Sequence, residues 1–158
     1  MEEYNMKLAN QLCFSAYNVS RLFARFYEQQ LKQFGLTYSQ YLVLLALWEH
    51  DNQPLHEIGK QLDLSSNTLT PLLKRLEQTG WVKRERGVED KRQLVVSLTD
   101  KGRNQQEEVY EAVAKCLPPE LNETKYHETK RVLDNLEASL KLTLSQNDIE
   151  KDDENDKI

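Results

Sequence analysis

The stretch from residue 55 to residue 98 contains two closely spaced helical patterns and then a hairpin pattern: LHEIGKQL at Leu55–Leu62, SSNTLTPLLKRLEQ at Ser65–Gln78, and VKRERGVEDKRQLVVSL at Val82–Leu98. Ser65 predicts the N-cap of the second helix, because its hydroxyl can accept an early backbone N–H. In the last segment, alternating side chains predict two strands joined by a loop at Gly87–Lys91. Two short helices followed by a hairpin form a helix-turn-helix with a wing, which can present one helix to a DNA groove.

Two further helices are predicted before this unit. Apolar side chains recur every three or four residues from Leu8 to Phe26, and Gly35 is a suitable residue to end that helix. Thr37 and Gln40 form a capping-box pattern at the start of a helix over Tyr38–His50, which is apolar nearly all round and therefore belongs in the core. Pro54 is expected to begin the helix Leu55–Leu62.

Two helices are also predicted after the wing, one from about Asp100 to Cys116 and one from about Asn122 to Leu144, separated by Pro118 and Pro119. The fold class is therefore mainly α with a small β-hairpin wing. We expect a single winged-helix domain over 1–144, with a DNA-binding lobe at about 37–99 and dimerisation helices at about 6–34 and 100–144. One winged unit cannot bury the apolar stripes of the flanking helices, so a homodimer is predicted.

Charge is distributed unevenly along the chain. The formal net charge is −5, but the window from Lys74 to Arg92 holds seven basic and four acidic side chains. The segment 145–158 holds six acidic side chains and is expected to be an acidic disordered tail. No apolar run is long enough to cross a bilayer and no secretory signal is evident, so a cytoplasmic location is expected.

Other chemistries find no support in the sequence. The three histidines have no metal-ligand spacing with one another or with the two cysteines, so no metal site is predicted. The sequence contains no Gly-rich phosphate loop, no Ser/His/Asp set and no paired catalytic carboxylates, so neither a cofactor nor an enzyme is expected.

Candidate DNA contacts lie at the start of the second short helix, further along it, and on the wing. Short hydroxyl and amide side chains at a helix N-terminus can donate to phosphates or base edges, although they can also serve only as caps. Arginines on a wing can enter a narrow minor groove. The candidates are Ser65, Ser66, Asn67, Thr68, Thr70, Lys74, Arg75, Arg86, Asp90, Lys91 and Arg92. Asp90 is expected to orient Arg92.

These residues resemble the MarR family of winged-helix transcriptional regulators, and within it the thiol-based branch that senses organic hydroperoxides. The resemblance covers about Leu8 to Gly102. It rests on the segments Asn10–Phe14, Leu36–Tyr41, Thr68–Arg75, Glu89–Arg92 and Ser97–Gly102. It implies a repressor that binds a palindromic operator as a dimer. Ser65 and Asn67 depart from the residues common in this branch, which puts the bases preferred at the helix start in doubt.

Cys13 is the candidate trigger. Tyr17 lies one turn further on the same helix face, and a phenol can favour a thiolate, but the residues alone leave a buried inert thiol and a reactive one equally open. The resemblance implies that Cys13 senses the oxidant, with Tyr17, Tyr27 and Tyr38 as partners across the dimer. It also makes Cys116 a possible resolving thiol in the second subunit, although an ordinary core or surface cysteine is the favoured interpretation.

The expected function is a repressor that releases operator DNA when organic hydroperoxide oxidises Cys13. Three alternatives remain: a regulator that responds to a small aromatic acid and has a structural Cys13, a thiol peroxidase, and a protein-interaction module that does not bind DNA.

Overall fold

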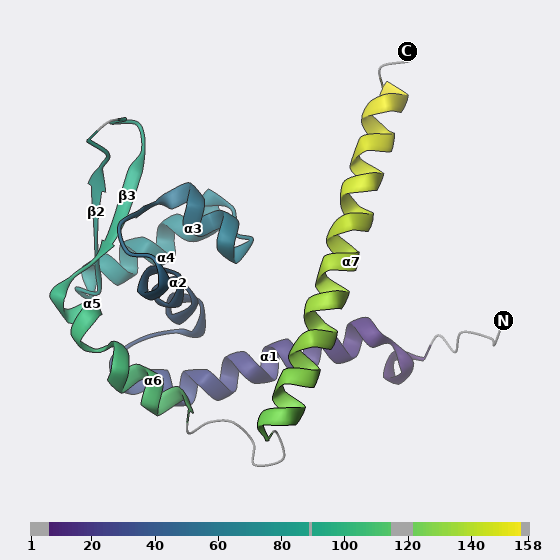
Figure 1. Ribbon diagram of the computed structural model, residues 1–158, viewed down its shortest axis with the longest axis horizontal. Coiled ribbons are helices and arrows are strands. Elements are labelled where there is room, and N and C mark those ends of the chain that lie inside the picture. Colours follow the sequence, from purple (N-terminus) through teal and green to yellow (C-terminus); the bar gives the residue numbers. More distant parts are fainter. Residues whose placement is uncertain (1–6, 89, 115–121, 156–158) are drawn as a thin grey trace. The chain divides into compact units, whose positions relative to one another are not determined.

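The computed structural model describes residues 7–88, 90–114 and 122–155. By its contacts the chain divides into two compact units, residues 1–116 and 117–158, where the sequence predicts one domain over 1–144. The first contains the helix-turn-helix, the hairpin and the helices on either side of them, and the second contains one long helix (Figure 1).

The two N-terminal helices lie where the sequence places them, but the first one is divided into a 3₁₀ turn, an α-helix and a second 3₁₀ turn. A short 3₁₀ turn at Leu8–Asn10 precedes α1 (Leu12–Leu31), and a second one (Lys32–Phe34) leads to Gly35, whose φ of 69° is left-handed. Helix α2 (Tyr38–Glu49) begins with a complete capping box. The Thr37 backbone N–H donates to Gln40 Oε1 at 2.9 Å, and the Gln40 N–H donates to Thr37 Oγ1 at 3.3 Å.

Helix α3 (Leu55–Leu62) and helix α4 (Ser66–Gln78) form the helix-turn-helix. Asp63 ends α3 in the left-handed region with φ 54°, and the Leu64 N–H donates to the Gly59 carbonyl at 2.8 Å. A Cβ at Gly59 would lie 2.8 Å from the Leu64 carbonyl oxygen, so the tight turn requires glycine there. Pro71 is accommodated without interrupting α4.

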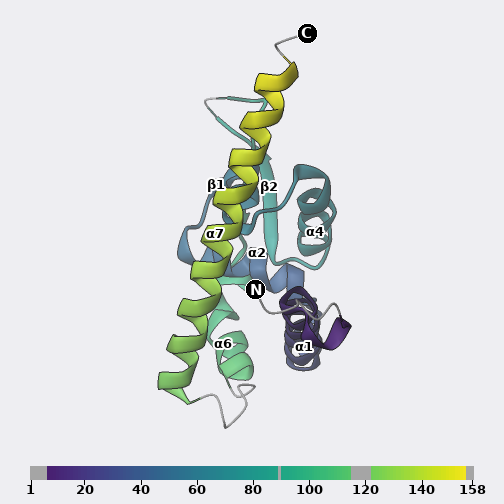
Figure 2. The same ribbon diagram turned by 90° about the vertical axis from the view of Figure 1, so that its right-hand side faces the viewer.

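The wing belongs to a three-stranded antiparallel sheet in the order β1–β3–β2, with β1 at Gln53–Pro54, β2 at Val82–Arg86 and β3 at Leu94–Leu98. Strands β2 and β3 are the predicted hairpin, which extends beyond the helices of its unit in both views (Figures 1 and 2). Strand β1 is absent from the sequence prediction. It has only two residues, and Pro54, which was expected to begin α3, instead pairs with Val95 and caps the helix.

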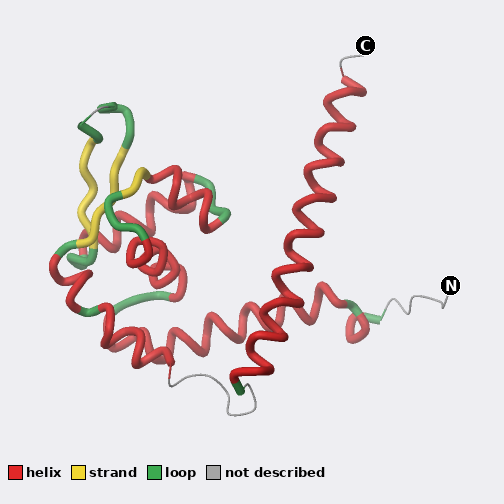
Figure 3. The backbone as a smooth tube through the Cα atoms, in the orientation of Figure 1, coloured by secondary structure: helices red, strands yellow, loops and turns green. Residues whose placement is uncertain are grey.

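The core of the first unit lies between α2, α4 and the sheet. Figure 3 shows the strands together on one side of these helices. Its largest fully buried side chain is Trp81, which lies just before β2. The apolar faces that the sequence assigns to the core are buried with it, at Val43, Leu44, Leu47, Ile58, Leu69, Leu73, Leu76 and Val96.

The predicted helix from Asp100 to Cys116 consists of two helices, α5 (Asp100–Asn104) and α6 (Gln106–Ala114), and its last two residues lie outside the described part. In a continuous helix the Gly102 carbonyl would accept the Gln106 N–H. It instead accepts the Trp48 indole N–H at 2.8 Å, which accounts for the interruption at Gln105. Helix α6 packs against α1.

Helix α7 (Glu123–Asn155) forms the second unit and is longer than predicted. It continues into the segment 145–158, for which a disordered tail was expected. Neither proline nor glycine occurs between Glu123 and Asn155, so the backbone can remain helical. From Asn122 to Gln146 every residue except the half-buried Leu136 is exposed.

We predict that Gly102→Ala lowers the free energy of unfolding by about 1–3 kcal/mol, because overpacking in a close-packed interior forces the backbone to shift. A Cβ there would clash with the Trp81 carbonyl oxygen and lie 3.1 Å from Leu98 Cδ2. Urea denaturation measures the loss. Gly35→Asn is the control, because its left-handed site has no neighbour within 4 Å of a Cβ and asparagine tolerates that conformation. An unchanged midpoint for Gly102→Ala would contradict the packing described here.

Candidate nucleic-acid interface

At the start of α4 some polar side chains stabilise the helix end, and others are exposed without an intrachain partner. Ser65 caps the helix: its Oγ accepts the Thr68 N–H at 3.4 Å and lies 3.1 Å from Thr68 Oγ1. Thr70 Oγ1 donates to the Ser66 carbonyl at 2.7 Å. The side chains of Ser66 and Asn67 are exposed and make no hydrogen bond within the described residues. These two are therefore available to a ligand, whereas the others already have intrachain partners.

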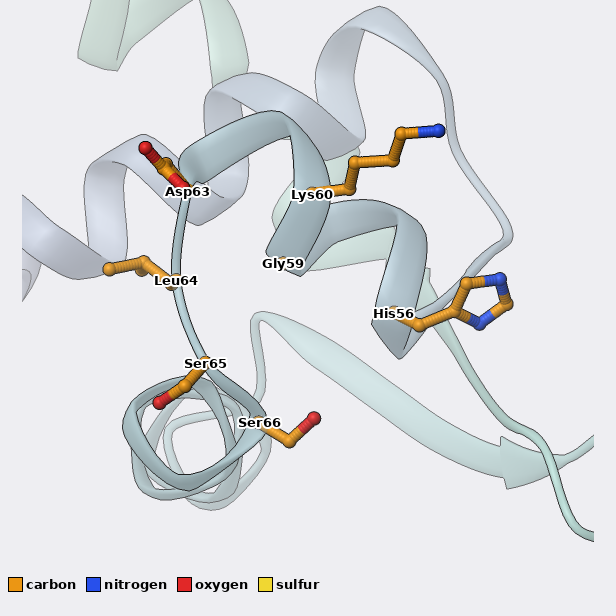
Figure 4. A pocket seen from close by; sticks show the side chains of 7 residues that line it. All are labelled: His56, Gly59, Lys60, Asp63, Leu64, Ser65 and Ser66. Atoms are coloured by element: carbon orange, nitrogen blue, oxygen red, sulfur yellow. The ribbon is translucent and has the colours of Figure 1, made fainter. Parts of the chain in front are cut away.

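An open hollow lies beside this helix start, between α3 and α4 (Figure 4). Ser65 and Ser66 line it from α4, while His56 and Lys60 line it from α3. Helix N-termini carry partial positive charge and unpaired N–H groups, which suit an anionic backbone. Lys60 adds a full positive charge, and the carboxylate of Asp63, which also lines the hollow, opposes it. Sequence reasoning missed Lys60, which its position on the exposed face of α3 could have indicated.

The wing loop is ordered by its own polar groups. The Asp90 carboxylate accepts the Arg92 backbone N–H at 2.9 Å, and the Arg86 guanidinium donates to the Lys91 carbonyl at 2.9 Å across the loop. The backbone adds bonds from Gly87 to Gln93 and from Gln93 to Asp90. Asp90 thus shapes the turn through the Arg92 backbone, while the side chains of Lys91 and Arg92 are exposed with no described polar partner. That Asp90 orients the Arg92 side chain stays a prediction.

Lys74 and Arg75 are also exposed, on the outer side of α4. All the candidate DNA contacts therefore lie on α4 and on the hairpin that follows it, and Asp90 is the only acidic one among them.

One ion pair joins α4 to the wing, and sequence reasoning missed it. Glu77 Oε1 accepts the Arg84 backbone N–H at 3.0 Å, and its Oε2 accepts Arg84 Nε at 3.0 Å and Nη2 at 2.6 Å. These hydrogen bonds stabilise the carboxylate, so Arg84 holds the pKa of Glu77 below its usual value. In the sequence both residues counted only toward the local charge.

A second polar group that was missed lies at the base of the wing. Asp51 Oδ1 accepts the Leu98 backbone N–H at 2.8 Å, and its Oδ2 accepts Arg103 Nη2 at 2.9 Å. The carboxylate thus connects the end of α2 with both β3 and α5. These partners lie far from Asp51 in the sequence, so no local pattern could have indicated them.

Within one chain, Cys13 and Tyr17 lie apart from the other two predicted sensing residues, Tyr27 and Tyr38. Cys13 is exposed near the start of α1, and Tyr17, 58% exposed, lies under the Arg21 guanidinium at 5.4 Å. Tyr27 packs against Tyr38 with ring centroids 5.4 Å apart. From Cys13 to Tyr27 the helix advances about 21 Å, so one chain cannot bring Cys13 to this pair.

Tyr38 is half-buried, and burial raises the pKa of its phenol, which therefore remains protonated and able to donate.

Cys116 lies outside the described residues. Over the described ranges, no group of three or more His, Cys, Asp or Glu side chains could hold a metal, and no helix is long and apolar enough to cross a membrane.

Residues 25–109 match the family described as transcriptional regulator SarA/Rot. The chain is 49% identical over 98 residues to the organic hydroperoxide resistance transcriptional regulator of Bacillus subtilis, which is 62% of this chain and 67% of that protein. It is 66% identical to AbfR, solved in its reduced form bound to DNA, with a TM-score of 0.84 and coverage of 91% of this chain and 99% of that one. Another AbfR structure gives the organism as Staphylococcus epidermidis.

Two other AbfR structures are also similar. Overoxidized AbfR bound to DNA is 65% identical, with a TM-score of 0.78 and coverage of 89% of this chain and 98% of that one. Disulfide-formed AbfR is 66% identical, with a TM-score of 0.64 and coverage of 89% and 94%. These matches confirm the winged-helix architecture predicted from the sequence.

We predict that Arg92→Ala weakens DNA binding while fold and thermal stability are retained, because its side chain is exposed and has no described polar partner. Losing one backbone contact should reduce the salt dependence of binding by about one unit. Fluorescence anisotropy with a labelled duplex at several salt concentrations measures both effects. Equal affinity for variant and wild type would mean that the wing does not touch DNA.

Proposed function

The chain belongs to the SarA/Rot transcriptional regulators, which are winged-helix proteins of the MarR type, and we propose that it is a repressor that releases its operator when organic hydroperoxide oxidises Cys13. The observation that carries the DNA-binding part is the set of exposed polar and basic side chains at the start of α4 and on the wing loop. There Ser66, Asn67, Lys91 and Arg92 have side chains with no described hydrogen-bond partner. The 66% identity to AbfR solved on DNA supports the same interpretation.

The candidate contacts have distinct roles in this proposal. Ser66 and Asn67 meet base edges in the major groove, while Ser65, Thr68 and Thr70 form and hold the helix end that receives a phosphate. Lys74, Arg75 and Lys91 contact the DNA backbone, and Arg92 enters the minor groove. Arg86 and Asp90 hold the wing loop in shape through their bonds to Lys91 and Arg92.

In this proposal the DNA-binding species is a homodimer that binds a palindromic operator. The protein acts in the cytoplasm, where it has access to the DNA. Large apolar side chains are exposed on both terminal helices, including Leu12 and Leu22 on α1 and Leu133 and Leu140 on α7. A second copy would cover these surfaces, and two-fold symmetry matches two half-sites about one helical turn apart.

Oxidation proceeds in two balanced steps. The Cys13 thiolate attacks a peroxide oxygen, the O–O bond breaks, and the departing alkoxide takes a proton to become an alcohol, leaving Cys13 as a sulfenic acid. A second thiolate then attacks the sulfenic sulfur, an S–S bond forms, and hydroxide leaves and is protonated to water. In the proposed dimer the phenols of Tyr27 and Tyr38 donate hydrogen bonds to the partner's Cys13 thiolate and so stabilise it.

The second thiol in this proposal is Cys116 of the partner subunit. AbfR has been solved in a disulfide form, and its overoxidized form was solved bound to DNA. We therefore take the disulfide, rather than an oxidised acid at Cys13, as the species that releases the operator. A disulfide requires its two Cα atoms to come within about 7 Å, which constrains the dimer helices and thus the spacing of the two DNA-binding lobes.

We predict a stable dimer at micromolar concentration by sedimentation velocity. On α7, Leu133, Leu136, Leu140 and Leu144 share one helix face, so Leu140→Glu should shift the protein toward monomer. Leu142→Glu is the matched control, because Leu142 points to the opposite side of the helix. A monomeric wild type would remove both the dimer and the palindrome from the proposal.

We predict that Cys13→Ser protein binds operator DNA with wild-type affinity but keeps it after treatment with an organic hydroperoxide. Serine preserves the size of the side chain and cannot form a sulfenic acid. Anisotropy of a labelled duplex before and after oxidant measures release. Release by the oxidised Cys13→Ser protein would overturn the sensor assignment.

Cys116→Ser completes the experiment. If Cys116 resolves Cys13, this variant should release DNA only when a small thiol is added with the oxidant, whereas unchanged release would make Cys116 structural. Peroxide consumption with an added reductant, measured beside DNA binding, separates a regulator from a thiol peroxidase, because only a reductant returns the oxidised cysteine to the thiol for another cycle. Continued turnover with a reductant, without any DNA binding, would favour the enzyme.

A further inference from the structure

We propose that Glu77 and Arg84 form a positioning clasp that fixes the angle between the recognition helix α4 and the wing, and that the wing's contribution to operator affinity depends on it. Neither side chain is among the DNA contacts proposed above. The inference rests on the proposed DNA-binding function, and it concerns how the two binding elements are held in register.

The contact holds the backbone of the strand as well as its side chain. In the sheet order β1–β3–β2, β2 is an edge strand, so alternate backbone N–H groups point away from β3. The Arg84 N–H donates to Glu77 Oε1, while its guanidinium binds Oε2 through two nitrogens. One carboxylate therefore fixes both the position and the rotation of the strand.

The surroundings of this pair differ from those of an ordinary surface ion pair. The Arg84 side chain is only 20% exposed, and its guanidinium is bound through two nitrogens in the geometry that makes arginine–carboxylate pairs strong. The neighbouring pair Lys83–Glu85 lies within the same strand, with side chains 54% and 65% exposed, and fastens β2 to nothing else. Among the described residues, every polar contact between α4 and β2 is made by Glu77 and Arg84.

Apolar packing holds the hairpin mainly through β3, where Val96, the partner of Arg84 in the sheet, is fully buried. On β2 itself Val82 is buried, but Lys83, Glu85 and Arg86 are exposed. The clasp is thus the polar contact with α4 furthest along the strand. From Arg84 to the loop tip at Val88 the chain extends about 13 Å, so a tilt of about 10° at the clasp would move the tip by about 2 Å. A shift of that size breaks hydrogen bonds to a groove only about 6 Å wide.

A double-mutant cycle tests the clasp. Wild type, Glu77→Gln, Arg92→Ala and the double variant are titrated with a duplex that the wild-type protein has selected from random sequence. Glutamine keeps the shape of glutamate but removes the charge. If the clasp acts through the wing, Glu77→Gln should weaken binding by about fivefold to tenfold alone and by less than about twofold when Arg92 is already alanine.

Two further variants make the test specific. Glu85→Gln is the matched control, since it makes the same change on β2 in the pair that does not reach α4, and it should leave affinity unchanged. Arg84→Lys keeps the positive charge but loses the planar fork, so it should behave like Glu77→Gln. Thermal melts of all variants identify any that are unfolded at the titration temperature.

The outcomes are distinct. Equal losses from Glu77→Gln with and without Arg92 would show that Glu77 acts through general stability or another contact, and no loss in either background would show that the wing is held without it. Either result overturns the clasp while leaving the proposed function intact. A wild-type protein that selects no duplex would overturn both.

Discussion

Burial of Trp81 joins the elements on which the rest of the first unit depends. Its backbone N–H donates to the Leu76 carbonyl at the end of α4, and its carbonyl accepts the Thr99 N–H at the start of α5. The Lys101 ammonium lies 4.9 Å from the centre of its ring, and the missing side chain of Gly102 lets α5 approach its carbonyl. The recognition helix α4, the wing and α5 are therefore all held by contacts to this one buried residue. A substitution of Trp81 would change the orientations of all three elements together.

Most of the first unit follows from local patterns. Capping signals at Thr37 and Ser65, apolar residues at steps of three and four, and the two short strand patterns over residues 82–86 and 94–98 each act within a few residues, so they can be found in the sequence alone. Strand β1 escaped prediction because two residues carry no periodicity. The break at Gln105 also escaped, because it depends on the indole of Trp48, which is distant in the chain.

The residues of the candidate site also fall into those that the sequence could predict and those that it could not. Exposed residues such as Ser66 and Arg92 could be proposed from the motif, because their places in it follow from chain order. The carboxylates of Asp51 and Glu77 could not, since their roles arise only when β3, α5 and β2 are packed. For Cys13 the chain order places Tyr17 nearby, whereas the distance to Tyr27 along α1 makes a role for that tyrosine depend on a second copy.

The division of labour at the start of α4 also bears on how such a protein could diverge. Ser65 and Thr68 are engaged in capping, and Leu69 is buried, so replacing any of them would disturb the helix. The side chains of Ser66 and Asn67 make no hydrogen bond within the described fold. A lineage could therefore exchange them freely and come to control different genes with the same scaffold, one substitution at a time, without passing through an unstable ancestor.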